Sequence, residues 1–332
     1  MADTLVWLVT LPLIGAVATL LLPRQANTIA SISAAATAVA AGFLVHAVYV
    51  HGALHYAIGG WHAGLGIALR ADGLSALLLL MTALVMLAAT VYAGAYYSTA
   101  GQRRQLWPLW LLLWTSLNAL LLAGDLFNLY VTLELLGLSA VTLACLGGKT
   151  AAIRAALRYL LVGLLGSMMF LAGVALVYAG HGTLDMAALT TAVSPGPVAW
   201  TALALMTAGL LLKSALFPLH FWLPPAHANA PAPVSAVLSA LVVKAAFYLV
   251  LRLWLEVFAA VITPASASLL GALGAGAVLW GSWQALQAER LKLMAAYSTV
   301  AQLGYLFLFF PLLQALPPGP ARDVAAGGLV IL

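Results

Sequence analysis

Ten stretches of about twenty mostly apolar residues recur along the 332-residue chain. A helix needs about 20 such residues to cross the hydrocarbon core of a bilayer. Charged residues make up only 6% of the chain and hydrophobic residues 65%, whereas a soluble domain carries roughly a quarter charged residues. The sequence therefore predicts an all-α integral membrane protein. The predicted spans are residues 4–22, 28–50, 74–97, 106–123, 127–146, 156–179, 198–222, 234–255, 265–285 and 294–313.

The two ends of the chain raise separate questions. The apolar stretch of residues 5–22 has no basic segment before it and is longer than the apolar core of a signal peptide, so it is expected to be the first span. At the other end, residues 322–332 resemble the beginning of an eleventh helix and finish in the apolar string GGLVIL. We expect a chain that is cut short or continued elsewhere.

Basic residues in the predicted loops indicate the orientation of the chain. With the N-terminus outside, eight of the 13 basic residues fall on the cytoplasmic side and three outside, which agrees with the positive-inside rule. The cytoplasmic set is Arg24, Arg103, Arg104, Lys149, Arg154, Arg158, Arg290 and Lys292, and the outer set is Arg70, Arg252 and Arg322.

Several kinds of chemistry find no support in the sequence. It contains no GxxxxGK[ST] phosphate loop, no CxxC pair and no HExxH motif, and Cys145 is its one cysteine, so a four-cysteine iron–sulfur site within the chain is excluded. The net charge of +5 is spread over short loops, which argues against nucleic acid as a partner. We therefore expect the lipid bilayer as the surroundings, with no cofactor and no metal site.

Three ionisable residues lie well inside predicted spans: Glu134 in the fifth, Lys213 in the seventh and Lys244 in the eighth. A charged residue at a helix centre costs roughly 2.5–3.5 kcal/mol on insertion scales. A Glu–Lys pair that only holds two helices together is one explanation, and a lysine near a helix end could reach the interface. The alternative is a proton relay, because burial disfavours the charged form of each group. Three such residues favour the relay, in which we expect the three side chains to converge around water inside the bundle.

The seventh span also carries a predicted helix break. Pro218 follows Lys213 by five residues and has no N–H, so the carbonyl of Ser214 would lose its helical partner. Broken backbone at membrane depth is tolerated where it lines a polar cavity. His220 and His227 follow, and because histidine titrates near neutrality they are secondary relay candidates, with interfacial loop histidines as the alternative.

Two further residues are expected on the Glu134 face of the fifth span. Tyr130 lies four residues before Glu134 and Gly137 three residues after it. A hydroxyl and a glycine there would allow a hydrogen bond and the close approach of another helix. Tyr130 is therefore another secondary relay candidate.

Three segments resemble the antiporter-like proton-conducting membrane subunits. They are GDLFNLYVTLELLGLSAVTL, LLKSALFPLHFWLPPAHANAPAPVSAVLSALVVKAAFYLVLR and ERLKLMAAYSTVAQLGYLFL. That family includes the large subunits of Mrp-type Na⁺/H⁺ antiporters, the membrane chains L, M and N of respiratory complex I, and membrane hydrogenase subunits. The likeness extends over essentially the whole chain, and the D-type Mrp protein is the nearest in character.

The resemblance implies roles for particular residues. Glu134 matches the fifth-helix glutamate of the family, Lys213 the seventh-helix lysine beside the break, and Lys244 the eighth-helix lysine. Arg158 resembles a basic residue that the family often places near the start of the sixth helix. A chain of this family has about fourteen helices with two inverted five-helix repeats, each forming a half-channel.

On this basis the chain divides into three parts. Residues 1–105 would hold helices one to three, and residues 106–257 a complete first repeat of helices four to eight with the break in helix seven. Residues 258–332 would hold part of the second, inverted repeat: helices nine and ten and the start of the eleventh. On this resemblance, the broken twelfth helix and its central lysine or glutamate would not be among these residues, and we expect a fragment, a split subunit or a partner that supplies them. Some members also carry an acidic residue where this chain has Pro225.

The expected function is that of a proton-translocating subunit in a multi-subunit cation/proton antiporter of the bacterial cell inner membrane. Its partners would be other membrane subunits, protons and a coupling ion such as Na⁺. The first alternative is a proton-pumping membrane arm of a complex I-like NADH:quinone oxidoreductase or membrane hydrogenase. The second is a non-conducting structural subunit. An enzyme with cofactor chemistry of its own is not expected.

Overall fold

A computed structural model describes residues 3–61 and 66–316. In that part, nine helices are long and apolar enough to cross a membrane, and one shorter apolar helix, Pro197–Lys213, accompanies them. They are α1 (Asp3–Leu21), α2 (Ala26–His51, extended to Pro23 by the turn η1, Pro23–Gln25), α3 (Gly73–Tyr96), α4 (Ala100–Leu122), α5 (Leu126–Ala144), α6 (Thr150–His181), α8 (Pro197–Lys213), the segment Ala232–Val257, α12 (Pro264–Leu286), and α13 (Leu291–Phe307) with α14 (Phe309–Ala315).

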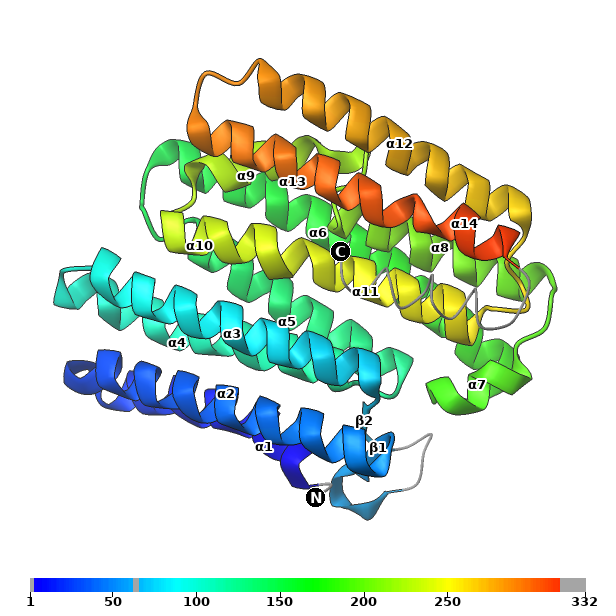
Figure 1. Cartoon of the computed structure of the whole chain (residues 1–332), viewed down its shortest axis with the longest axis horizontal. Coiled ribbons are helices and arrows are strands. Elements are labelled where there is room, and N and C mark those ends of the chain that lie inside the picture. The colour runs from blue at the N-terminus through cyan, green and yellow to red at the C-terminus, as the bar shows by residue number, and fades with distance from the viewer. Residues whose placement is uncertain (1–2, 62–65, 317–332) are drawn as a thin grey trace.

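These helices lie side by side in layers (Figure 1). The helices α1 and α2 pack on each other and on α4 and α3, while α12, α13 and α14 form the layer at the opposite side. Between them lie α5, α6, α8 and the segment Ala232–Val257. That segment and α4 are mostly buried, so the core of the bundle lies around them. The prediction of an all-α membrane protein with about ten spans is confirmed.

The segment Ala232–Val257 is not a uniform α-helix. It consists of α10 (Ala232–Val237), the π-helical turn η4 (Leu238–Val242), α11 (Val243–Arg252) and a second π-helical turn, η5 (Leu253–Val257). Turns of this kind inside α-helices often accompany functional sites. Lys244 lies at the start of α11, directly after the first of them.

Local capping fixes where the functional helices begin. The carboxylate of Asp125 accepts a hydrogen bond from the backbone N–H of Asn128 at 2.7 Å, which caps the first turn of α5. Asp72 and Ser75 form a capping box at the start of α3. Because a helix turns about 100° per residue, the Asp125 cap also sets the face on which Glu134 projects.

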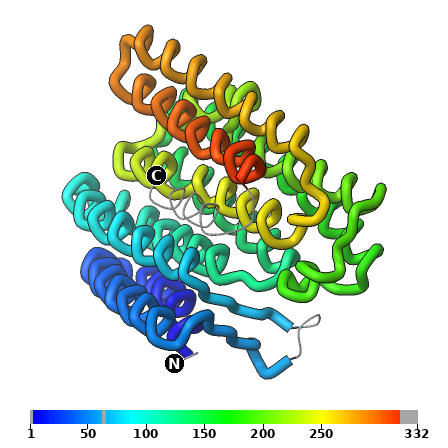
Figure 2. The backbone as a smooth tube through the Cα atoms, turned by 45° about the vertical axis from the view of Figure 1, so that its right-hand side comes forward, coloured from blue at the N-terminus to red at the C-terminus, as the bar shows by residue number. Residues whose placement is uncertain are grey.

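Two elements were not expected from the sequence. A β-hairpin joins α2 to α3, in which β1 (Leu54–Ala57) pairs antiparallel with β2 (Ala68–Ala71), and the turn η2 (Ile58–Gly60) follows β1. The hairpin lies beyond the helix ends, on the side of the N-terminus (Figure 2). The short helix α7 (Met186–Ala192) lies between α6 and α8. Both are too short to produce the twenty-residue apolar signal on which the predicted spans depend.

The predicted helix 198–222 is wrong beyond Lys213. The helix α8 ends at Lys213, and the chain continues through a 3₁₀ turn, η3 (Leu219–Trp222), into the short helix α9 (Leu223–Asn229). The helix ends before the missing N–H of Pro218 requires it to: Ser214 donates the last i→i−4 hydrogen bond, to Leu210, and Ala215 has a φ of 55° in the left-handed region. The expected start of an eleventh helix, residues 322–332, lies outside the described residues.

Candidate functional site

The helices α5 and α8 bring together two of the three predicted buried charges. The Nζ atom of Lys213 lies 3.0 Å from Oε1 of Glu134, at hydrogen-bond distance, although the residues are 79 positions apart. The two side chains are only 9% and 18% exposed, respectively. An ion pair in such surroundings is screened far less by water and salt than a surface pair. Its strength is therefore sensitive to small changes in separation.

Close contact between α6 and α8 gives this pair its surroundings. A Cβ atom on Gly166 would lie 2.7 Å from the carbonyl oxygen of Gly209, so both positions need glycine for the helices to approach this closely. One residue further along α6, the hydroxyl of Ser167 donates a hydrogen bond to the Oε1 atom of Glu134. Sequence reasoning missed Ser167. The signal that could have found it is the pair Gly166 and Gly173, seven residues apart and facing α8.

The neighbours of Glu134 on its own helix differ in what they contribute. A Cβ atom on Gly137 would lie 3.6 Å from Nζ of Lys213, so this glycine leaves room for the amine. The ring of Tyr130 lies 6.1 Å from that of Phe127, and no hydrogen bond joins Tyr130 to Glu134 in the described part of the chain. Of the two residues, the structure brings only Gly137 to the pair.

A cavity of about 30 Å³ adjoins the Glu134–Lys213 pair. A buried water needs roughly 10–15 Å³ of such space, so the cavity can hold about two. The ring of Tyr159, on α6, forms part of its wall and is 5% exposed. Most of the cavity wall is apolar, and its polar groups are those of Glu134, Lys213 and Tyr159. Water held beside these groups could carry protons, which a dry apolar helix contact cannot.

Lys244 does not join the other two charges, contrary to the expectation that all three converge. Val242 and Ala246 line the cavity at the pair, and Lys244 lies midway between them in sequence, on the opposite face of the helix. There it lines a second, larger cavity of about 230 Å³ with Thr82 and Tyr248. The expectation failed because the sequence shows that a residue is in a span but not which way its helix is turned.

The two histidines lie after the helix break and are buried. His227 is 4% exposed, and its Nδ1 atom lies 2.7 Å from the hydroxyl of Ser235, while its Nε2 atom has no partner in the described residues. His220 is 9% exposed and packs on the rings of Phe217 and Tyr297. Neither histidine is a solvent-exposed loop residue, so the interfacial alternative does not describe their surroundings.

Arg158 lies on α6 next to Tyr159 but points elsewhere. It is exposed, and no ion pair of Arg158 occurs in the described residues. The structure therefore places Tyr159, and not Arg158, at the Glu134–Lys213 pair. Neighbouring positions on a helix face about 100° apart, so this difference follows from one residue of register.

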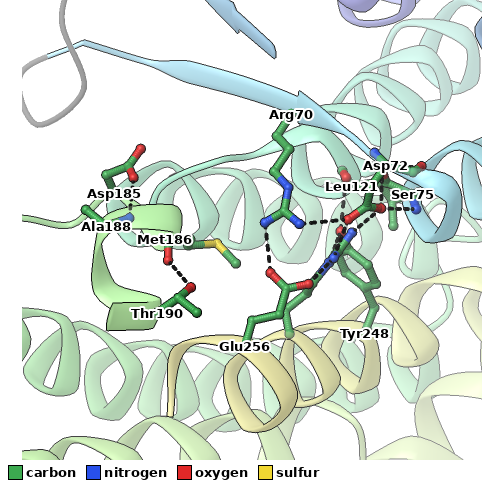
Figure 3. A network of polar contacts seen from close by, with 11 residues as sticks. Arg70, Asp72, Ser75, Leu121, Asp185, Met186, Ala188, Thr190, Tyr248 and Glu256 are labelled. Atoms are coloured by element: carbon green, nitrogen blue, oxygen red, sulfur yellow. Dashed lines mark hydrogen bonds and ion pairs between the residues drawn. The ribbon is translucent and has the colours of Figure 1, made fainter. Parts of the chain in front are cut away.

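A second group of charges lies at the other end of α11 (Figure 3). Arg252 donates to both carboxylate oxygens of Asp72 at 2.6 Å and also pairs with Glu256. Arg70, on strand β2, pairs with the same two acids, at 3.0 Å to Asp72 and 2.8 Å to Glu256. We call these four residues the Arg–acid cluster. The hydroxyl of Tyr248 accepts a further hydrogen bond from Nε of Arg252.

The Arg–acid cluster also changes how Asp72 titrates. Burial alone would raise the pKa of the Asp72 carboxyl, but the hydrogen bonds and positive charge of Arg252 hold that pKa well below its usual range. Asp72 therefore stays charged across the physiological pH range. Sequence reasoning missed it because Asp72 and Arg252 are 180 positions apart.

Comparison with known proteins gives a consistent result. Residues 123–314 match the family described as NADH:quinone oxidoreductase/Mrp antiporter, TM. The chain is 41% identical over 260 residues to the N subunit of NADH-quinone oxidoreductase from Desulforudis audaxviator, covering 76% of this chain and 52% of that protein. It is 33% identical over 258 residues to the D subunit of the Na⁺/H⁺ antiporter from Bacillus subtilis, covering 75% of this chain and again 52% of the relative.

Among solved structures, a chain of the archaeal membrane-bound sulfane sulfur reductase, a respiratory membrane complex, superimposes with a TM-score of 0.90. The two are 29% identical, and the match covers 98% of this chain and 67% of that one. The present chain thus spans about half the length of the two relatives named above. Glu134, Lys213 and Lys244 all fall within the matched family region.

Proposed function

Because the chain belongs to the NADH:quinone oxidoreductase and Mrp antiporter transmembrane family, we propose that it is a proton-translocating subunit of a multi-subunit cation/proton antiporter. The observation that carries the proposal is the buried Glu134–Lys213 pair beside the broken seventh span and a cavity large enough for water. Intramembrane ionisable residues of this kind mark ion pathways by default. The multi-pass membrane character of the chain agrees with this role.

The pair works as a switch through its separation. At 3.0 Å the carboxylate of Glu134 stabilises the ammonium of Lys213, which therefore keeps its proton. Two charges 4 Å apart attract each other by about 4 kcal/mol at an effective dielectric of 20. When the pair opens, this attraction is lost and the ammonium releases its proton to water in the adjoining cavity. When the pair closes again, the amine is reloaded.

The other candidates extend this relay in two directions. Lys244 receives the proton on the far side of α11, where its cavity begins. His220 and His227 supply protons from the side of the helix break, where Arg290 and Lys292 also donate to backbone carbonyls at the end of α9. In the described part of the chain, Tyr130 and Arg158 form no hydrogen bond or ion pair with Glu134 or Lys213, and they have at most an accessory role.

Partners, ions and location form part of the proposal. The protein would assemble with other membrane subunits, as the chains of respiratory membrane complexes do, and exchange protons for Na⁺ or another cation. We place it in a bacterial inner membrane with the N-terminus outside. In support, this orientation puts eight basic residues on the inner side and three on the outer side, in agreement with the positive-inside rule.

A second candidate function is a proton-pumping arm of a complex I-like oxidoreductase. It is favoured by the 41% identity to an oxidoreductase subunit, which exceeds the 33% identity to an antiporter subunit. The relay would be the same and only its driving force would differ. Proton uptake into vesicles driven by NADH, with no cation gradient, supports this alternative, whereas uptake that requires a Na⁺ or K⁺ gradient supports the antiporter.

The proposal is tested by Lys213→Ala in the assembled complex, with cation-driven proton movement measured in inverted vesicles. We expect exchange to fall at least about 100-fold, because a relay without its central amine has no group to carry the proton. The control is Lys149→Ala, at the exposed start of α6, which should leave exchange unchanged. Exchange at the wild-type rate in Lys213→Ala would instead indicate a structural subunit.

A further inference from the structure

Trp222 connects the two halves of the broken seventh span through the contacts of its side chain with α6 and α8. It is 1% exposed and ends the turn η3, two residues after His220. Its indole ring stacks on that of Tyr159, with ring centres 4.2 Å apart and planes inclined by 8°. Its Nε1–H group donates a hydrogen bond to the backbone carbonyl of Leu212 at 2.9 Å.

The carbonyl that accepts this hydrogen bond lies at the end of α8, next to Lys213. Leu212 precedes Lys213, the last residue of α8, and its carbonyl also accepts a hydrogen bond from the backbone N–H of Ala215 at 3.2 Å. The final carbonyls of a helix have no partner in a further helical turn. They form the negative end of the helix dipole, which favours a nearby cation. The end of α8 and the carboxylate of Glu134 both attract the Lys213 ammonium. The hydrogen bond from Trp222 offsets part of the negative end of the helix dipole and so favours the contact with Glu134.

The stacking partner is equally well placed. Tyr159 lines the cavity at the Glu134–Lys213 pair and lies on α6, the helix whose Ser167 holds the Glu134 carboxylate. The Trp222 ring thus joins the end of α8 to the helix that positions the acid. A purely structural role would be met by stacking alone, whereas the directed N–H contact to Leu212 goes beyond filling space.

We propose that Trp222 is a positioning residue for Lys213: its indole N–H holds the end of α8 so that the ammonium faces Glu134, and it couples this pair to the segment that carries His220 and His227. The inference rests on the proposed function, because it concerns the same relay. Displacement of α9 would break the Trp222–Leu212 hydrogen bond and loosen the pair, which gives the histidine-bearing segment control over proton release.

The test uses Trp222→Phe in the assembled complex, which keeps an aromatic ring for the stack and removes only the N–H donor. We expect cation-driven exchange to fall by about 3- to 10-fold, which is the range for losing one buried hydrogen bond. The pH profile of exchange should also move by roughly 0.5 unit to the acid side, since an ammonium held less closely to Glu134 releases its proton at lower pH. The amount of chain in the membrane should stay unchanged.

Trp110→Phe is the matched control. Trp110 is also fully buried, and its indole N–H donates to the hydroxyl of Thr90 at 2.9 Å, between α4 and α3 and away from the pair. This variant should lower stability by a similar amount but leave the pH profile in place. A wild-type rate and profile in Trp222→Phe would overturn the inference, as would an equal shift in Trp110→Phe.

Two further measurements keep the outcome decisive. If Trp222→Phe assembles poorly, exchange is expressed per assembled chain, and Tyr159→Leu, which removes the stacking partner but keeps the indole N–H, should shift the profile in the same direction. An unshifted profile in Trp222→Phe, per assembled chain, refutes the inference whatever Tyr159→Leu shows. Lys213→Ala distinguishes failure of the proposed function from failure of this inference. If Lys213→Ala exchanges normally, the proposed function fails. If Lys213→Ala loses exchange while Trp222→Phe behaves as the wild type, only the role of Trp222 is refuted.

Discussion

The Glu134–Lys213 pair and the Arg–acid cluster both hold opposite charges at hydrogen-bond distance, but they differ in how many partners each charge has. Within the described residues Lys213 has one charged partner, and a cavity adjoins it. Arg252 is held by both oxygens of Asp72, by Glu256 and by the hydroxyl of Tyr248. A charge with one partner can be released by one movement, whereas a charge with several partners cannot.

The Glu134–Lys213 pair is therefore suited to open and close, whereas the Arg–acid cluster is suited to stabilise the fold. The Arg–acid cluster ties strand β2, the start of α3 and the end of α11 together (Figure 3). Its two arginines are matched by two acids, so the cluster has no net charge. The Glu134–Lys213 pair lies between α5 and α8 and beside a helix break, where the backbone can move without breaking a continuous helix.

The largest expected effect on stability comes from breaking the cluster with Arg252→Met. This change leaves the carboxylates of Asp72 and Glu256 without their main partner, and removing one partner of a buried ion pair costs about 3–5 kcal/mol. The free energy of unfolding in detergent should fall by that amount. Arg24→Met, at an exposed position, is the control and should change it by less than about 0.5 kcal/mol. If the free energy of unfolding fell as little as in the control, the cluster would not stabilise the fold.

A smaller effect is expected from acid. Because the pKa of Asp72 is lowered in the folded protein, its stabilising contribution is present above the unfolded pKa, near 4, and lost as pH falls below it. The difference in unfolding temperature between the wild type and Asp72→Asn should therefore be constant from about pH 5 to 8 and shrink below about pH 4. A change of that difference between pH 6 and 8 would contradict the assignment.

Tyr248→Phe should have a modest effect. The Tyr248 hydroxyl donates to the carbonyl of Leu121 at 3.1 Å and accepts from Arg252. Removing a hydroxyl from a network whose other members remain paired costs about 1 kcal/mol, measured as the free energy of unfolding. Exchange should stay near the wild-type rate, because Arg252 keeps its two acids. A loss of exchange larger than the loss of assembled protein would connect the cluster to the relay.

The smallest effect on stability is expected from a double replacement that abolishes exchange. Replacing both members of the pair, in Glu134→Gln with Lys213→Met, removes two buried charges together, and such replacements are often neutral or stabilising. The double variant should unfold within about 1 kcal/mol of the wild type and yet show no exchange. A strongly destabilised double variant would mean that the pair, like the cluster, is there to hold helices together.

The sequence alone located most of the candidate site. A charged residue among apolar neighbours is conspicuous, so Glu134, Lys213 and Lys244 could be selected, and a proline close to Lys213 indicated the break. Ser167, Tyr159 and Trp222 could not be selected in this way, because serine, tyrosine and tryptophan are ordinary in membrane helices. Their importance lies in what they contact, on helices distant in sequence.

What the sequence determined by itself is which segments lie in the membrane, since lipid accepts a helix according to its own residues, and which charges must therefore be buried. The tertiary structure decided how each helix is turned and which partner each charge meets. One helix rotation separates Lys244 from the Glu134–Lys213 pair, and one close approach of glycines on α6 and α8 creates the surroundings of that pair. Membrane insertion depends on local composition, but pairing depends on angles and distances between helices that meet only after folding.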